Sequence, residues 1–170
     1  MIKLKAESSK DIVSGMKEVG IDFISSLPSN NLVSLIHDIM QDPDFTHVPV
    51  ANENGCIGLC YGAYLTGKKP AFVAQNSGLL MATYAFMDSI YWFGNFPLLM
   101  VIDHRGDYGD PSGWNFVGYG IQIPKILESF QIPYMIVREP EKLKAEVVNG
   151  GLMATACRRP ACILISGEEI

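Results

Sequence analysis

The sequence predicts an α/β fold in three layers (α/β/α), with a doubly wound, mostly parallel sheet of about six strands between two layers of helices. Short apolar runs alternate with amphipathic segments along the whole chain, and this alternation is typical of βαβ units. Residues 97–102 are continuously apolar, which indicates a parallel strand that is buried on both faces. Because no repeat or linker interrupts the 170 residues, we expect 1–170 to form a single domain.

The individual elements follow from hydrophobic spacing and from residues that begin or end helices. Ile12, Met16 and Val19 share one helical face in a helix that begins at Ser8 or Ser9, and Gly20 ends it. The further expected elements are, in order, a strand at 21–26, a helix at 32–39, a strand at 48–51, a helix at 53–66, a strand from 71, a helix at 79–93, a strand at 97–102, a short helix at 125–130, a strand at 133–137, a helix at 140–157 and a strand at 160–166. Residues 103–120 form the longest stretch without such spacing, and loops of this length are usually functional.

The most unusual stretch is the third predicted helix. Asn52 offers a side-chain oxygen that can cap this helix, and Glu53 lies in its first turn. Gly55, Gly58 and Gly62 share one face, although each glycine costs about 1 kcal/mol relative to alanine inside a helix. We therefore predict a buried helix whose backbone closely approaches another group. Glu53 is either an anion stabilised by the helix dipole or a functional carboxyl, and its apolar surroundings favour the second interpretation.

Composition argues against several classes of function. The net charge of −5 and the pI near 5.1 argue against nucleic-acid binding, which needs a basic surface. No apolar run approaches the ~18 residues that a membrane helix needs, and no signal-peptide pattern begins the chain, so we expect a cytoplasmic protein. We interpret Cys56, Cys60, Cys157 and Cys162 as small buried residues, and we expect no metal site within this chain.

Polar residues follow several of the predicted strands. Ligands of open parallel sheets gather at the carboxyl ends of the strands, so these residues are candidates for a common site. The segments expected at that edge are 26–30, Asn52–Glu53, Asn76–Gly78 and 103–109. Taken alone, asparagine, serine and glycine at 76–78 are also ordinary turn residues.

The runs NENGCIGLCYGAYLTGKKPAFVAQNSGL and PLLMVIDHRGDYGD resemble the pyrimidine-binding (Pyr) domain of thiamine-diphosphate enzymes. The resemblance covers roughly residues 11–166, and it is strongest to sulfopyruvate decarboxylase α subunits, followed by the N-terminal half of phosphonopyruvate decarboxylases. It implies that thiamine diphosphate is the cofactor and that Glu53 forms a hydrogen bond with N1′ of its aminopyrimidine. The residues that it implies around the cofactor are Asn52, Glu53, Asn76, Ser77, Gly78 and Leu79.

The same resemblance implies decarboxylation of a 2-keto acid such as sulfopyruvate or phosphonopyruvate. An arginine suits a sulfonate or phosphonate, although Arg105 is as readily explained by an ion pair with a nearby aspartate. Aromatic residues at 114, 116 and 119 leave open an apolar or aromatic keto acid, or contact with a partner chain. The candidate substrate contacts are Pro28, Ser29, Asn30, His104 and Arg105.

The chain lacks the Gly-Asp-Gly…Asn pattern with which a second domain of these enzymes holds Mg²⁺ and the diphosphate. The resemblance therefore implies a separate β subunit that carries this pattern and holds the Mg²⁺. Thiamine diphosphate would be shared between the two chains, in a hetero-oligomer with two or more copies of each. Three alternatives remain at this point: a carboligase that joins the decarboxylated fragment to an aldehyde or a second keto acid, a catalytically silent scaffold, and a flavodoxin-like binding module, for which the sequence offers no phosphate loop.

Overall fold

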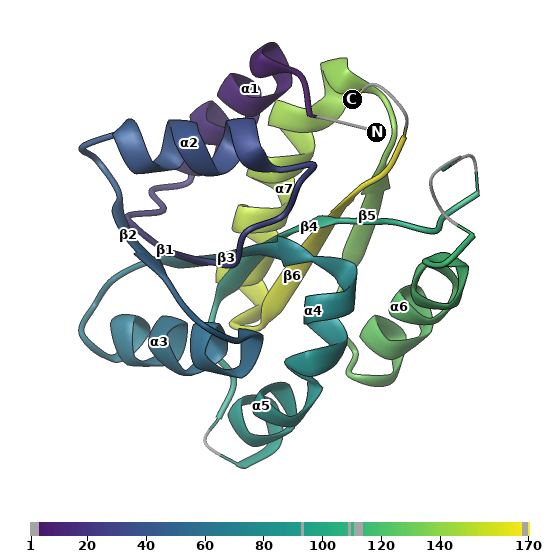
Figure 1. The fold of residues 1–170 in the computed structure, drawn as a ribbon. Coiled ribbons are helices and arrows are strands. Elements are labelled where there is room, and N and C mark those ends of the chain that lie inside the picture. The colour runs from purple at the N-terminus through teal and green to yellow at the C-terminus, as the bar shows by residue number, and fades with distance from the viewer. Residues whose placement is uncertain (1–3, 93, 109, 111–113, 168–169) are drawn as a thin grey trace.

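The computed structural model describes residues 4–92, 94–108, 110, 114–167 and 170. Its strands form one six-stranded sheet in the order β2-β1-β3-β4-β6-β5, and neighbouring strands are parallel throughout. Helices cover both faces of this sheet (Figure 1). The predicted three-layer fold with a doubly wound parallel sheet is confirmed.

Strands and helices alternate along the chain as the sequence predicts. The strands are β1 (Phe23–Ser26), β2 (Thr46–Pro49), β3 (Pro70–Gln75), β4 (Leu98–Asp103), β5 (Tyr134–Val137) and β6 (Pro160–Ile165). The helices are α1 (Ala6–Glu18), α2 (Val33–Gln41), α3 (Glu53–Leu65), α4 (Asn76–Met81), α5 (Thr83–Met87), the π-helix η1 (Asp88–Trp92), α6 (Val117–Ser129), the 3₁₀-helix η2 (Pro140–Lys142) and α7 (Leu143–Cys157).

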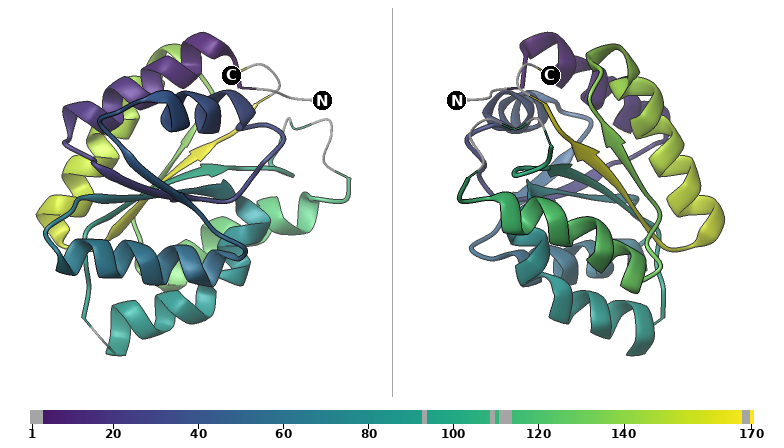
Figure 2. Two further views of the ribbon diagram at one scale, coloured as in Figure 1. Left: turned by 60° about the vertical axis from the view of Figure 1, so that its left-hand side comes forward. Right: turned by 90° about the vertical axis from the view of Figure 1, so that its right-hand side faces the viewer.

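The two helical layers pack on separate apolar cores. Helices α1, α2 and α7 cover one face of the sheet, and α3 to α6 cover the other (Figure 2). Side chains of β4 alternate between the two cores, because successive residues of a strand point to opposite faces. Leu99 and Val101 belong to the first core, and Leu98, Met100 and Ile102 belong to the second. The continuously apolar run that predicts this strand therefore serves both layers.

The order of the strands places a reversal of the chain direction across the sheet beside β1. From β1 the chain moves outward to β2 and then crosses back to β3 on the other side of β1. In doubly wound sheets such a reversal leaves an opening between the diverging connections, and ligands bind there. The segments that follow β1, β2, β3 and β4 surround this point, and they include all the predicted site residues.

Several element boundaries differ from the prediction. Residues 76–78 are not a turn but the first turn of α4, and the single helix predicted at 79–93 is divided into α4, α5 and η1. The short helix predicted at 125–130 begins at Val117, where Gly118, Gly120 and the internal Pro124 conceal the helical pattern. Phe93, the predicted end of one helix, and Gly109, the predicted end of a site segment, lie outside the described residues.

The predicted burial of α3 is wrong for its glycine face. Cys56, Ile57 and Cys60 are buried, and α3 packs on β1 and β3. Gly58 and Gly62 are exposed, and a Cβ at either position has no described atom within 4 Å. The backbone that the sequence predicts to be closely approached is therefore open within the described part of the chain.

The cysteines are buried as predicted at three positions but not at the fourth. Cys56, Cys60 and Cys162 are buried, and burial raises the pKa of the Cys56 thiol to about 11. Cys157 is exposed, contrary to the prediction. It is the last residue of α7, whose buried face ends at Ala154.

Candidate active site

The first turn of α4 connects the other segments of the carboxyl edge. Gly78 lies against Glu53 at the start of α3, while the Asn76 side chain bonds to the loop that follows β4. At the end of β4, Asp103 bonds in turn to the loop that follows β1. The structure thus brings the predicted segments together into one row of contacts, although they are far apart in the sequence.

Within this row of contacts, the Glu53 side chain lies directly against Gly78. A Cβ added at Gly78 would lie 2.3 Å from Oε1 of Glu53 and 2.7 Å from its Cδ and Cγ, so only glycine leaves room for the carboxyl in this position. Asn52 caps α3 by accepting a hydrogen bond at 2.9 Å from the Gly55 amide, as the sequence predicts. The cap fixes the first turn of the helix and, with it, the backbone of Glu53.

The Glu53 side chain is half-buried rather than sealed in the core or fully in solvent. Within the part of the chain that the structure describes, the Glu53 carboxylate has no hydrogen-bond or ion-pair partner. A carboxylate that is held in place and left without a partner is available to bind a ligand group at this edge of the sheet.

Asn76 and its neighbours have different surroundings. The Asn76 side chain is fully buried and donates a hydrogen bond at 2.6 Å to the Arg105 carbonyl oxygen, while its Oδ1 has no partner among the described atoms. Ser77 is half-buried and accepts a hydrogen bond at 3.0 Å from the Gln75 amide. Leu79 is 1% exposed and belongs to the core beneath α3 to α6.

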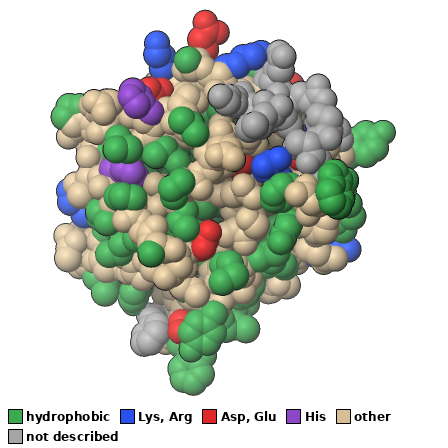
Figure 3. Space-filling model, viewed as in Figure 1, with side chains coloured by type: hydrophobic (Ala, Val, Ile, Leu, Met, Phe, Trp, Pro, Cys, Tyr) green, Lys and Arg blue, Asp and Glu red, His purple; other side chains and the backbone are tan. Residues whose placement is uncertain are grey.

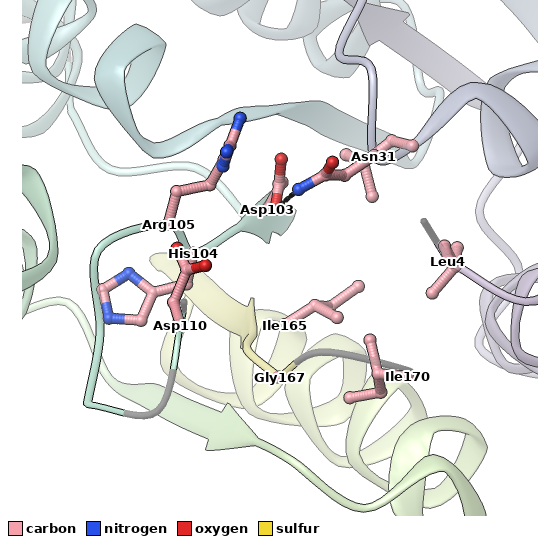
Figure 4. A pocket seen from close by; sticks show the side chains of 10 residues that line it. Leu4, Asn31, Asp103, His104, Arg105, Asp110, Ile165, Gly167 and Ile170 are labelled. Carbon is pink, nitrogen blue, oxygen red and sulfur yellow. Dashed lines mark hydrogen bonds between the residues drawn. The ribbon is translucent and has the colours of Figure 1, made fainter. Parts of the chain in front are cut away.

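His104 and Arg105 follow β4 and lie beside the first turn of α4 (Figure 4). Burial lowers the pKa of His104, so its imidazole is neutral at neutral pH. Its Nδ1 faces the Asn76 amide at 3.5 Å, and its buried Nε2 has no partner among the described atoms. Arg105 stacks on the ring of Phe116, with 4.2 Å from the guanidinium carbon to the ring centre, an arrangement typical of a cation–π contact.

Gly106 and Asp107, which follow β4, make close contacts with other elements of the fold. Gly106 has a φ of +79°, and a Cβ there would lie 2.0 Å from the Phe116 carbonyl oxygen. Asp107 pairs with Arg138 and accepts a hydrogen bond at 2.9 Å from the Ser166 hydroxyl. Burial alone raises the pKa of Asp107, but the hydrogen bonds from the Ser166 hydroxyl and the Tyr108 backbone, together with the charge of Arg138, outweigh it, and the net direction is downward. This loop therefore holds a firm position at the carboxyl edge.

Asp103 is the residue of the site that the sequence analysis missed. It is 6% exposed and accepts hydrogen bonds from the Ser29 hydroxyl at 2.9 Å and the Asn31 amide at 3.1 Å. Burial raises the pKa of its carboxyl, and these two bonds oppose that shift. The sequence analysis places Asp103 in the segment 103–109 at this edge but assigns it no role in the site. An aspartate that directly ends a continuously apolar strand is the signal that could have identified it.

The candidate substrate residues of the loop after β1 alternate between exposed and buried side chains. Pro28 and Asn30 are exposed, whereas Ser29 is buried with its hydroxyl bonded to Asp103. Of these three side chains, only the first and third are open to a ligand.

A small hollow of about 10 Å³ lies at the carboxyl edge, beside the residues that follow β4 (Figure 4). This volume is sufficient for about one water molecule. In the described part of the chain, no cluster of three or more histidine, cysteine, aspartate or glutamate residues could hold a metal ion. No helix among the described residues is long and apolar enough to cross a membrane. The residues that line the hollow are Leu4, Asn31, Leu32, Asp103, His104, Arg105, Asp110, Ile165, Gly167 and Ile170.

Helices α3 to α6 carry many exposed large apolar side chains, and Figure 3 shows hydrophobic side chains over α4 and α5. The aromatic residues among them are the most prominent, with Trp92 81% and Tyr84 71% exposed. Large exposed apolar patches mark interaction sites on proteins. We refer to this surface as the apolar face, and its members are Leu59, Leu65, Met81, Tyr84, Met87, Tyr91, Trp92, Val117 and Ile121.

Comparison with solved structures identifies the fold. The fold is similar to that of 2-oxoglutarate:ferredoxin oxidoreductase from Magnetococcus marinus, with a TM-score of 0.68 and 16% sequence identity over 95% of this chain and 28% of that chain. At this low identity the likeness concerns the fold alone, a three-layer α/β/α architecture around a parallel sheet. No family model matches the sequence.

Comparison with curated proteins defines the family. The chain is 31% identical over 158 residues to sulfopyruvate decarboxylase subunit alpha from Methanococcus maripaludis, which is 93% of each chain. It is 36% identical over 131 residues to the protein of the same name from Methanocaldococcus jannaschii, covering 77% of this chain and 76% of that one. The chain therefore belongs to the family of sulfopyruvate decarboxylase alpha subunits, and the predicted resemblance is confirmed.

A longer relative shows a different chain organisation. The sulfopyruvate decarboxylase from Methanosarcina acetivorans is 30% identical to this chain. The match covers 91% of this chain but only 39% of the relative. That relative thus contains more than twice the polypeptide represented here.

Proposed function

We propose that this chain, as one Pyr domain over residues 1–170, is the α subunit of a two-chain 2-keto acid decarboxylase that uses thiamine diphosphate. The observation that carries the proposal is the Glu53 carboxyl, which lies against the bare backbone of Gly78 at the carboxyl edge. Family membership supports the reaction class. Sulfopyruvate is the first substrate to test, because the alpha-subunit relatives carry its name.

The residues at the edge fit the aminopyrimidine of thiamine diphosphate. Its N1′ needs a carboxyl partner, and Glu53 offers a half-buried carboxyl without another partner among the described residues. Gly78 supplies a side-chain-free surface beside that carboxyl, and the orphaned Oδ1 of Asn76 is a further acceptor. When bound, thiamine diphosphate supplies the nucleophilic carbon and the electron sink that decarboxylation of a 2-keto acid requires.

Glu53 has the central role in this proposal. It holds a hydrogen bond at N1′ and exchanges a proton there, and this bond strengthens once the site is closed from water. The cap at Asn52 and the contact with Gly78 hold the carboxyl in place before any ligand binds, which reduces the reorganisation needed for the reaction.

The substrate lies beside this carboxyl in our proposal, next to the loops after β1 and β4. Neutral His104 carries its proton on Nε2, because Nδ1 faces the Asn76 amide donor. Since His104 is 2% exposed and its Nε2 is buried without a partner among the described atoms, we assign it to the inner wall of the site. Arg105 provides a positive charge at the same edge, steadied by the ring of Phe116. Pro28 and Asn30 form the exposed part of the opposite loop.

A partner chain completes the site in this proposal. Ligand pockets usually measure about 300–1,000 Å³, whereas the hollow at the carboxyl edge measures about 10 Å³. The apolar face and the open glycine face of α3 offer a surface for a second chain. The relatives named as alpha subunits and the longer single-chain relative fit this division of labour.

The partner also provides the groups that this chain lacks. The sequence contains no Gly-Asp-Gly pattern, so we assign the diphosphate and its Mg²⁺ to a β subunit that carries Gly-Asp-Gly…Asn. We propose a hetero-oligomer with two or more copies of each chain, in which each cofactor is held between an α and a β subunit.

The proposal is tested by co-purifying this chain with such a β subunit and measuring CO₂ release from sulfopyruvate and phosphonopyruvate. Glu53→Gln is expected to lower kcat by about 10²-fold or more without loss of complex formation. Glu146→Gln is the matched control, because Glu146 also lies in the first turn of a helix but on the opposite layer.

Two results would contradict the proposal in different ways. Decarboxylation by the isolated chain would exclude a shared site, and unchanged turnover in Glu53→Gln would favour a silent scaffold. Analysis of the products distinguishes release of an aldehyde from carboligation.

A further inference from the structure

Asp103 joins two loops of the carboxyl edge that are distant in the sequence. Its Oδ2 accepts the bond from Ser29 and its Oδ1 accepts the bond from Asn31, across separations of 74 and 72 positions. The three side chains are 5–6% exposed, so water competes little for these bonds. Hydrogen bonds to an ionised carboxylate are stronger than bonds between neutral groups, and here both oxygens of the carboxylate bond to the same loop.

These two bonds determine which residues of the β1–α2 loop (27–32) face outward. Ser29 and Asn31 turn inward to Asp103, and the residues that alternate with them, Pro28 and Asn30, are exposed. The Leu4 amide donates to the Asn31 carbonyl oxygen at 3.0 Å, which attaches the far end of the loop. Apart from the Asp103 carboxylate, no group in the described part of the chain holds the Ser29 hydroxyl.

We propose that Asp103 is a positioning residue for the reaction, which holds the β1–α2 loop so that Pro28 and Asn30 face the substrate. The inference rests on the proposed function, since it takes this loop as one wall of the substrate site. Asp103 acts through the loop and does not contact the substrate. Its removal therefore impairs substrate binding more than the chemical step that depends on Glu53.

The test compares two substitutions of Asp103 in the α/β complex. Asp103→Ala removes both acceptors, and we expect the KM for sulfopyruvate to rise about tenfold while kcat changes less than about threefold. Asp103→Asn retains one acceptor for Asn31 and gains a donor for the Ser29 hydroxyl, so it is expected to restore most of the wild-type KM. Asn31→Ala removes one of the two bonds and is expected to raise the KM less than Asp103→Ala does. It also keeps the test available if Asp103→Ala does not fold.

The matched control is Asp38→Asn. The Asp38 carboxylate accepts a bond from the Ser9 hydroxyl at 2.5 Å and links α1 to α2, and it has no bond to the β1–α2 loop among the described residues. It is expected to leave the KM unchanged. A rise in KM equal to that of Asp103→Ala would assign the effect to general loosening of the fold and would overturn the proposal.

Hydrogen exchange gives a readout that does not depend on activity. We expect the amides of 27–32 to exchange faster in Asp103→Ala than in the wild-type complex, with little change elsewhere. Unchanged exchange in this loop, or a loosened loop with an unchanged KM, contradicts the proposal. If the wild-type complex decarboxylates no 2-keto acid, the proposed function fails, while the exchange measurement still decides whether Asp103 holds the loop.

Discussion

The two edges of the sheet differ in the size of their hollows and in the chemical character of the side chains that line them. At the amino edge, a hollow of about 260 Å³ is lined mainly by apolar residues such as Val19, Ile21 and Leu98, and its charged groups are Lys68 and Lys69. At the carboxyl edge, the hollow is only about 10 Å³, but aspartate, histidine and arginine side chains line it. The larger space therefore lies at the edge with few groups capable of proton transfer.

This difference indicates an incomplete site rather than a misplaced one. The carboxyl edge contains a positioned carboxyl, a neutral imidazole and an arginine, and the hollow that the imidazole and the arginine line measures only about 10 Å³. A second chain over the apolar face can supply the missing wall, as our proposal requires. The amino edge has room for a small apolar molecule, but that room does not make it catalytic.

The largest effect is expected from Gly78→Ala, which tests the carboxyl edge directly. The added Cβ would lie 2.3 Å from Oε1 and 2.7 Å from Cδ and Cγ of Glu53. All three atoms belong to one flexible side chain, so Glu53 can swing away while the fold survives. We expect kcat, measured on the α/β complex, to fall about 10²-fold. The melting temperature, measured on the isolated chain, is expected to change little.

Gly62→Ala is the control for this substitution. Gly62 lies in α3 like Glu53, and a Cβ there has no described atom within 4 Å. Alanine in its place is expected to stabilise the isolated chain by up to about 1 kcal/mol. Wild-type activity in Gly78→Ala would mean that the contact with Glu53 has no part in the reaction.

A smaller effect is expected from Trp92→Ser, which tests whether the apolar face binds the partner. Trp92 is 81% exposed, so its replacement costs the isolated chain little stability. If the aromatic ring is buried by a β subunit, its loss is expected to weaken the complex about 30-fold, since central aromatic residues of interfaces contribute about 2 kcal/mol or more. Titration by calorimetry or light scattering measures the change in Kd.

Met40→Ser provides the comparison for the partner surface. Met40 is 60% exposed on α2, in the opposite helical layer, and its replacement is expected to leave the Kd unchanged. Equal weakening by both substitutions would place the interface elsewhere.

Most of the fold could be predicted from the sequence, because parallel strands buried on both faces leave continuous apolar runs. The strand at 98–103 and its neighbours follow from this signal. Helix boundaries near glycine and proline were harder to predict from the sequence. In α6, Gly118, Gly120 and Pro124 weaken the helical pattern, and Gly120 is needed where its backbone meets the Gly106 carbonyl oxygen, 2.1 Å from an added Cβ.

The site was predictable in its chain segments but not in its contacts. Glu53 and Gly78 stand out as a carboxylate at a helix start and a glycine after a strand, yet only the fold shows that they touch. Asp103 can be singled out as an aspartate at the end of an apolar strand, but its partners lie 74 and 72 positions away and follow only from the fold. The exposure of α3 was mispredicted because an apolar helix has the same composition whether its outer face meets the chain's own core or a partner.

The smallest effect is expected from binding of the β subunit on the reactivity of a thiol at the amino edge, which thiol labelling can measure. Cys157 ends α7 and is exposed, whereas Cys56 is buried near the start of α3 with its pKa raised to about 11 by burial. A thiol reagent should therefore modify Cys157 rapidly in the folded chain, and the three buried cysteines only after denaturation. Adding the β subunit should leave the rate at Cys157 unchanged, because the proposed interface lies on α3 to α6. Protection of Cys157 by the partner would move the interface toward α7 and remove the distinction between the two edges on which the incomplete-site interpretation depends.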